Sequence, residues 1–250
     1  VGDVALMLSV MAGPDPSSPI SISEPGASFR RDPERDFRGT RIAFSADFGG
    51  LPIDPRVSAV LESQRQVFAG LGCEIDDTAP DLSDAHEVFQ TLRAVGLVAT
   101  RGELLKTHRH LLKDTAIWNI EKGLSLNGGD VGRAQRLQAQ VFQRMKAFMD
   151  RYEFLIVPVN QVPPFSVDTP YPTEIDGVTM DSYIDWMKSC YYITVTGHPA
   201  ISVPCGFTPE GLPVGVQIVG RYRDEFGLLQ LAHAFERATQ FGRRRPPVVG

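Results

Sequence analysis

Residues 196–220 read TGHPAISVPCGFTPEGLPVGVQIVG and contain two runs in which apolar residues alternate with small or polar ones. The first run covers residues 201–207 and the second covers residues 214–218. A period of two is typical of β-strands. Between the runs, residues 208–211 supply a proline that fixes φ and a glycine that tolerates positive φ. We therefore predict that the two strands form an antiparallel hairpin.

The residues around this hairpin favour a structural role. Pro204 and Pro213 cannot donate to a strand ladder, so we expect them at strand ends, edges or bulges. After the hairpin, residues 224–239 carry apolar side chains at helical spacing and predict an amphipathic helix. Ser202 has no His or Lys at an activating spacing, and Cys205 follows the apolar alternation. We therefore expect both side chains to be structural.

Earlier segments predict an α/β fold. Residues 41–48 and 73–78 are strand candidates, and residues 55–71 between them have helical periodicity with Asp54 as N-cap and Pro55 at the first helical position. A strand, a helix and a strand in this order imply parallel pairing. Residues 154–157 form a continuous apolar run, which is typical of a buried strand.

The remaining segments are helical or irregular. Residues 4–11 are apolar except for Ser9, so we expect a helix buried on several sides. Residues 84–122 are predicted to be mainly helical. Asp130 is a candidate N-cap for a helix that leads into the strand at residues 154–157, and a further helix is expected from 181 to about 194. The proline-rich residues 14–40 and 158–172 predict surface connections.

Composition limits the function classes. The 250 residues have a net charge of −5 and 42% hydrophobic content, and the densest basic cluster is a tail at residues 243–245, so we expect no nucleic-acid partner. No apolar run approaches the ~20 residues of a membrane span, so no membrane association is expected. Three scattered cysteines argue against a disulfide framework and favour the cytoplasm. His108 and His110 would diverge on a helix, and no metal site is predicted.

Several blocks resemble the amidase signature family. Residues 196–220, continuing through Asp224-Glu225, are similar to the family's GLPAISVPCGF…GLPVGLQLVG…DE block. The opening VGDVALML and the following MAGPDP resemble the family helix downstream of the serine loop. Residues 154–158 are similar to the family's DVLLTPT strand, with Glu153 at the position of the aspartate. The first of these blocks is specific and the other two support it.

The resemblance implies an incomplete α/β/α sandwich with a mixed central sheet, with residues 1–250 as a single partial domain. It also implies a cofactor-free amidase that cleaves a small carboxamide through an acyl-serine and releases ammonia. The family uses a serine, a second serine in a cis peptide and a lysine. Ser17-Ser18 is flanked by prolines instead of glycines, and no lysine has the family context. We therefore assign no catalytic residue and expect this portion to be inactive alone.

Four residues are candidates for substrate binding. By resemblance, Asp224 would bind a substrate amino group, although capping of the following helix is the alternative. Gln138 aligns with an arginine that holds the glutamine carboxylate in the tRNA-dependent amidotransferase subunit, and a neutral amide cannot make that bidentate contact. Trp186 and Tyr191 could line an aromatic pocket, with ordinary core packing as the alternative.

Three functions follow from these observations. The first is an amidase that acts on a small amide. In this case the chain's partner is the missing N-terminal segment or, alternatively, a second copy of the chain. The second is a non-catalytic remnant or interaction module of the same fold. The third is one of the subunits of a tRNA-dependent amidotransferase, which Gln138 disfavours. Loss of a half that covers about 2,000 Å² of mostly apolar surface would also make the chain unstable alone.

Overall fold

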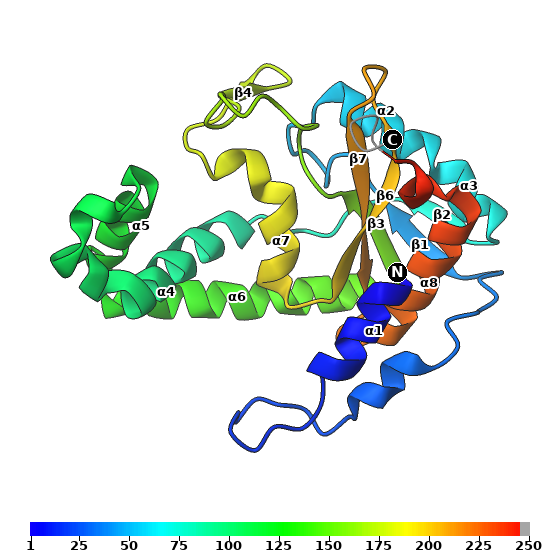
Figure 1. The fold of residues 1–250 in the computed structure, drawn as a ribbon, viewed down its shortest axis with the longest axis horizontal. Coiled ribbons are helices and arrows are strands. Elements are labelled where there is room, and N and C mark those ends of the chain that lie inside the picture. Colours follow the sequence, from blue (N-terminus) through cyan, green and yellow to red (C-terminus); the bar gives the residue numbers. More distant parts are fainter. Residues whose placement is uncertain (246–250) are drawn as a thin grey trace. The chain divides into compact units, whose positions relative to one another are not determined.

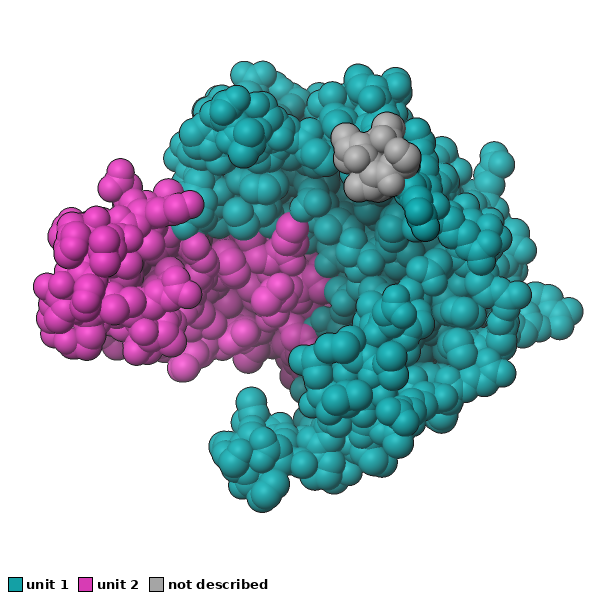
Figure 2. All heavy atoms as spheres, in the orientation of Figure 1, with its two compact units in different colours: residues 1–79, 149–189, 198–250 teal, residues 80–148, 190–197 magenta. Residues whose placement is uncertain are grey.

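The computed structural model describes residues 1–245, which form two compact units (Figures 1 and 2). Unit 1 contains residues 1–79, residues 149–189 and the described residues from 198 onward. Unit 2 contains residues 80–148 and 190–197. Both units are assembled from separate stretches of sequence. A single partial domain over residues 1–250 stays a prediction.

Unit 1 contains a five-stranded sheet in the order β2-β1-β3-β7-β6 (Figure 1). Its strands are β1 (Arg41–Phe44), β2 (Glu74–Asp77), β3 (Phe154–Pro158), β6 (Ala200–Phe207) and β7 (Pro213–Gly220). β1 pairs in parallel with β2 and β3, whereas β7 is antiparallel to β3 and β6. The predicted parallel strand–helix–strand unit, the hairpin and the α/β class with a mixed sheet are confirmed.

The hairpin of β6 and β7 explains the positions of its prolines. The register shifts between Pro204 and Gly206, and Pro213 begins β7. β6 is an edge strand. The N–H that Pro204 lacks therefore does not remove a hydrogen bond from the centre of the sheet. Gly206 has φ 151°, and a Cβ there would lie 2.7 Å from Val60 Cγ1. The bulge therefore brings the backbone close to a neighbouring helix, where only glycine fits.

Three helices of unit 1 lie next to this sheet: α2 (Pro55–Ser63), α3 (Arg65–Gly70) and α8 (Glu225–Thr239). α2 contacts β3, β6 and β7, α8 contacts β6 and β7, and α3 contacts α8. The Asp54 side chain accepts a hydrogen bond of 2.9 Å from Arg56 N, as expected of the N-cap. The predicted continuous helix is interrupted at Gln64, which is buried at 7% exposure.

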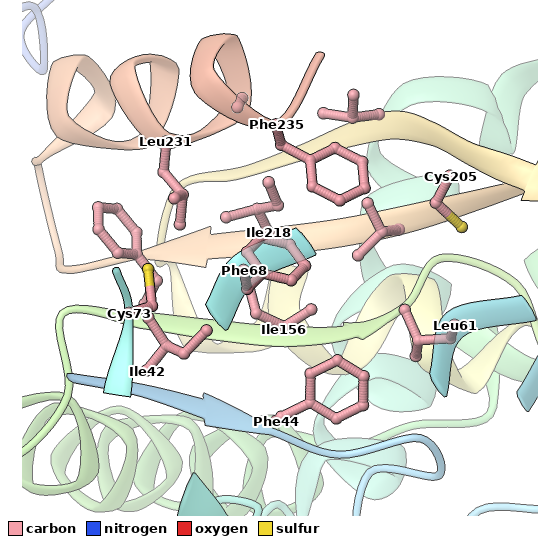
Figure 3. Close-up of a cluster of buried hydrophobic side chains, with 14 of the residues drawn as sticks. Ile42, Phe44, Leu61, Phe68, Cys73, Ile156, Cys205, Ile218, Leu231 and Phe235 are labelled. Carbon is pink, nitrogen blue, oxygen red and sulfur yellow. The ribbon is translucent and has the colours of Figure 1, made fainter. Parts of the chain in front are cut away.

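The main apolar core lies between these helices and the sheet (Figure 3). Phe68 of α3 stacks on Phe235 of α8, with ring centroids 4.8 Å apart and an interplanar angle of 18°. Ile156 of β3 and Ile218 of β7 are both fully buried in the same cluster. The strand residues therefore alternate between this core and the other face of the sheet, as their period predicts.

The prediction of a buried N-terminal helix is wrong. α1 (Gly2–Met11) contains no buried residue. It packs against the short 3₁₀ turn η1 (Gly26–Arg30), which leaves most of its surface open. Its large exposed side chains are Val4, Leu6, Met7, Val10 and Met11. An apolar sequence makes burial favourable but does not supply the surface that would cover it.

Unit 2 is built from α4 (Ala85–Thr107), η2 (Arg109–Leu111), α5 (Asp114–Leu124), most of α6 (Gly128–Met149) and the later part of α7 (Lys188–Thr196). α4 packs against α5. The N-cap of α6 was predicted at Asp130 and this is wrong. Asn127 Oδ1 accepts from Gly129 N at 2.7 Å and from Asp130 N at 3.2 Å, and Asp130 Oδ2 accepts from Asn127 N at 2.9 Å. Asn127 and Asp130 therefore form a reciprocal capping box. The N-cap is Asn127, three residues before the predicted position.

The remaining elements are short. The helix expected from residue 181 begins with η3 (Asp185–Met187) and continues as α7. A small hairpin joins β4 (Glu174–Ile175) to β5 (Val178–Thr179), and η4 (Phe241–Arg243) follows α8. No helix within residues 1–245 combines the length and apolarity needed to cross a bilayer.

Candidate functional site

A pocket of about 310 Å³ in unit 1 lies at the end of the sheet where β3 finishes and β7 begins. Trp186 of η3 and Phe165 form one wall, and their rings meet edge to face at 5.3 Å and 86°. Val57 of α2 and the start of β7 form other walls. The full lining is Val57, Asn160, Val162, Pro163, Pro164, Phe165, Trp186, Pro213, Val214 and Gly215. The lining side chains are therefore mostly apolar or aromatic, while Asn160 and backbone polar groups also face the pocket.

Gln161, which is fully buried, fixes the loop that carries Phe165. Its Nε2 donates to Pro52 O at 3.0 Å, and its Oε1 accepts from Lys188 N at 2.7 Å. Its backbone carbonyl also accepts from Asp54 N at 2.8 Å. One side chain thus connects the loop to the segment before α2 and to the start of α7. Breaking these bonds would leave buried polar groups unpaired, which is costly.

Gln217 of β7 makes a second buried connection. Its Nε2 donates to Ser189 O at 3.1 Å and to Pro158 O at 3.3 Å. The Ser189 hydroxyl in turn donates to Val159 O at 2.7 Å. Neither glutamine was among the residues predicted from the sequence to have a role. A polar residue inside an apolar strand was the available signal for Gln217.

Asp224 lies at the opposite end of the sheet and caps α8. Its Oδ1 accepts from Gly227 N at 3.0 Å, which is the structural alternative considered for this residue. It is also close to the ion pair of Arg35 and Glu153. The pKa of Arg35 is raised mainly by its hydrogen bond to Glu153 and further by the negative charge of Asp224. Substrate binding by Asp224 stays a prediction.

Trp186 and Asp224 are too far apart to hold the same small molecule. The Trp186 pocket reaches β7 at Pro213, Val214 and Gly215, whereas Asp224 follows the other end of β7 at Gly220. From Gly215 to Gly220 an extended strand advances about 17 Å, at roughly 3.4 Å per residue. A small carboxamide can therefore contact only one of these two side chains.

Tyr191 is buried within unit 2 at 3% exposure. Its ring stacks on Phe89, with centroids 3.9 Å apart and an interplanar angle of 7°. Its hydroxyl and His86 Nδ1 are hydrogen-bonded at 2.7 Å. These contacts match the core-packing alternative, and a role in substrate binding stays a prediction.

Gln138 of α6 also belongs to unit 2 and is partly exposed. Its Nε2 is 3.5 Å from Val195 O, a long hydrogen bond. A neutral amide at this position can donate from its NH2 group and accept at its carbonyl oxygen, but it cannot form the paired charged bonds of an arginine. Its assignment to substrate binding is untested by these contacts.

Ser17 and the two buried thiols of unit 1 lack the setting of an activated nucleophile. Ser17 Oγ donates to Asp15 Oδ1 at 2.7 Å, so its hydroxyl closes a local turn. Burial raises the pKa of the Cys205 thiol to about 12 and that of Cys73 to about 11. Within residues 1–245, no group of three or more His, Cys, Asp or Glu side chains is placed to hold a metal ion. We assign no catalytic residue to the described chain.

The thiols should differ strongly in reactivity. Cys190 is less buried than Cys73 and Cys205, and only the thiolate reacts with a disulfide reagent. At about pH 8 the raised pKa of the two buried thiols should slow their labelling on the order of 100-fold relative to an open thiol. Labelling should therefore show one fast thiol, and Cys190→Ser should remove that phase. Fast labelling of the native Cys190→Ser variant would contradict this expectation.

Comparisons with known proteins agree with this fold. The Amidase family model matches residues 1–229. An acylamidase of Rhodococcus erythropolis is 31% identical over 249 residues, covering 98% of this chain and 52% of that protein. A glutamyl-tRNA(Gln) amidotransferase subunit of Myxococcus xanthus is 28% identical, covering 99% of this chain and 55% of that protein. The chain thus spans about half the length of these relatives.

The solved structures give the same result. A bacterial aryl acylamidase of the amidase signature family superposes with a TM-score of 0.87 at 25% identity, covering 98% of this chain and 54% of that one. The 6-aminohexanoate cyclic dimer hydrolase has a TM-score of 0.84 at 20% identity, covering 100% of this chain and 55% of that one, which supports the fold alone. The chain belongs to the amidase signature family.

Proposed function

We propose that this chain is part of an amide hydrolase that acts on a small carboxamide and releases ammonia. The observation that carries the proposal is the family match over residues 1–229. In this proposal a serine supplied by amidase sequence outside the chain attacks the amide carbon. The tetrahedral oxyanion collapses to an acyl-serine as ammonia leaves, and water then releases the acid. Residues of this chain bind and orient the substrate.

The exposed face of α1 supports the need for a partner. Five large apolar side chains of this one helix are exposed, led by Met11 at 74% and Val10 at 71%. Contiguous exposed apolar surface on a folded protein usually marks an interaction site. We propose that the amidase segment carrying the serines and the lysine covers α1, and that the chain alone is inactive. The alternative is that a second copy of this chain covers the same face.

Substrate contacts remain part of the proposal. Asp224, Trp186, Tyr191 and Gln138 are the proposed binding residues, and Trp186 and Asp224 must serve different molecules or different parts of a long one. The cytoplasm is the proposed location, because the three cysteines are odd in number and widely scattered in the sequence.

Complementation tests the proposal directly. We expect no ammonia release from a simple carboxamide by the chain alone, and hydrolysis when it is mixed with a separately produced N-terminal amidase portion that carries the serines and the lysine. Leu6→Asp should weaken assembly, because it places a charge in the exposed apolar face of α1. Val167→Asp is the matched control, since Val167 is 97% exposed and lies outside α1.

The outcomes separate the alternatives. Ammonia release by the chain alone would overturn the placement of the nucleophile. Binding of the two portions without hydrolysis would favour a non-catalytic module of the same fold. Equal activity of the Leu6→Asp and Val167→Asp mixtures would exclude α1 as the docking face.

The tRNA-dependent amidotransferase is a second candidate because a relative bearing that name is 28% identical. Gln138 weighs against glutamine as the substrate, because it cannot pair with a carboxylate as a guanidinium does. Glutaminase activity of the mixed portions, or retention of tRNA by them, would support this candidate. If Gln138→Arg created glutaminase activity that the parent lacks, the role of this position in specificity would be supported.

A further inference from the structure

The Trp186 pocket has the features of a preformed site for a small ring. Phe165 remains 41% exposed although it is large and apolar, and its ring stands perpendicular to that of Trp186. Pro163 and Pro164 extend the apolar surface on the same loop. An apolar cavity of about 150 Å³ is enough to hold benzene. The volume of about 310 Å³ therefore leaves room for one ring and a substituent.

Buried hydrogen bonds join the walls of this pocket to one another. The walls come from α2, the loop at residues 160–165, η3 and the start of β7, which are distant in sequence. The buried side chains of Gln161 and Gln217 join these segments through four hydrogen bonds of 2.7–3.3 Å. A rigid pocket loses little conformational entropy on binding, which favours affinity for a small ligand.

The charge around the pocket selects a neutral ligand. None of the described residues that line it carries a charged side chain. The charged residues that flank the lining residues in sequence form two ion pairs. Lys188 Nζ lies 3.3 Å from Asp185, and Arg56 lies 2.7 Å from Asp54. A charged ligand would lose hydration without gaining an opposite charge.

We propose that the Trp186 pocket binds a neutral aromatic ring of a small molecule, and that this site is separate from the Asp224 end of the sheet. The ring packs against Phe165 and Trp186 in the offset or edge-to-face geometries that aromatic groups prefer. The site also lies beyond the carboxyl ends of the parallel strands β1 and β3, which is where open α/β sheets commonly bind ligands. The proposal goes beyond amide hydrolysis, because it requires no catalytic group.

Tryptophan fluorescence can test the site in the full chain. The protein has two tryptophans, Trp118 and Trp186, and Trp118→Phe leaves the pocket residue as the only reporter. The probes are benzyl alcohol, cyclohexylmethanol and benzylamine, which differ in the ring or in charge and contain no amide bond. Excitation at the red edge of the indole band avoids absorption by the probes.

We expect a saturable response to benzyl alcohol with a dissociation constant of about 1 mM or tighter. Cyclohexylmethanol and benzylamine should bind more weakly. Phe165→Ala should weaken benzyl alcohol binding between about 2-fold and about 10-fold, because it removes an aromatic contact. Val167→Ala is the matched control on the same loop, and it should leave the affinity unchanged within about 2-fold.

A separate variant tests independence from the other end of the sheet. Asp224→Asn retains a side chain that can cap α8, so it should fold and should bind the ring as the parent does. Three results would overturn the proposal: a response to benzyl alcohol that does not saturate, equal binding of cyclohexylmethanol, or equal effects of Phe165→Ala and Val167→Ala. The hydrolase proposal can fail or succeed independently, since no probe is a substrate for hydrolysis.

Discussion

Phe235→Ala is expected to lower the free energy of unfolding by about 3–5 kcal/mol, the usual range for deleting a buried aromatic side chain. Phe235 is fully buried on α8, and its ring stacks on Phe68 with centroids 4.8 Å apart (Figure 3). Alanine would remove the ring's apolar contacts and leave a cavity between α8 and the sheet. Native proteins are stable by only about 5–15 kcal/mol, so this change should remove a large part of the total.

Urea unfolding measured by circular dichroism would report the effect as a lower midpoint with an unchanged slope. Phe165→Ala is the matched control, because it deletes the same side chain at a position that is 41% exposed. We expect less than about 1 kcal/mol from this control. Equal destabilisation by the two variants would show that α8 does not pack on the sheet as described.

Local chemistry was sufficient to predict the hairpin and the parallel unit. The alternation in residues 201–207 specified β6, and Pro204 lies at a bulge of an edge strand as its missing N–H requires. Asp54 and Pro55 predicted the start of α2 because capping depends only on neighbouring residues. Asp176 and Gly177 give the same kind of signal for the hairpin of β4 and β5, since both have positive φ as in a type I′ turn. No element was predicted for residues 173–180, because that dipeptide was overlooked.

Features that depend on distant partners could not be predicted in this way. The apolar sequence of α1 predicted burial, but the covering surface is a property of the tertiary structure and not of those ten residues. The candidate site residues were chosen by resemblance and by residue type, and neither reports distance. Only the tertiary structure shows that the pocket of Trp186 lies at the start of β7 and that Asp224 follows its end. The structural role of Gln161 was not predicted. A glutamine in a proline-rich loop is normally expected to face solvent, and only the tertiary structure shows its buried hydrogen-bond partners.

Gly123→Ala is expected to destabilise unit 2 by about 1–3 kcal/mol, even though alanine favours a helix by about 1 kcal/mol over glycine. Gly123 lies in α5 where that helix packs against α4. A Cβ at this position would be 2.4 Å from Ala94 O and 2.6 Å from Val98 Cγ2. Because the nearest atom is backbone, the two helices would have to separate, which opens the packing along their whole contact.

Gly102→Ala is the matched control, since it makes the same substitution in α4 where the nearest atom to a new Cβ is Val98 Cγ1 at 3.7 Å. This distance is ordinary contact, so the control should stabilise the protein by about 0.5–1 kcal/mol through helix propensity. Hydrogen exchange would locate the effect of Gly123→Ala: the amides of α4 and α5 should lose protection before those of β3 and β7. If both variants changed stability in the same direction, the close approach of α4 and α5 would be wrong. Gly123 lies in unit 2 and Phe235 lies in unit 1. Gly123→Ala and Phe235→Ala therefore measure the packing of α4 on α5 and the packing of the main core separately.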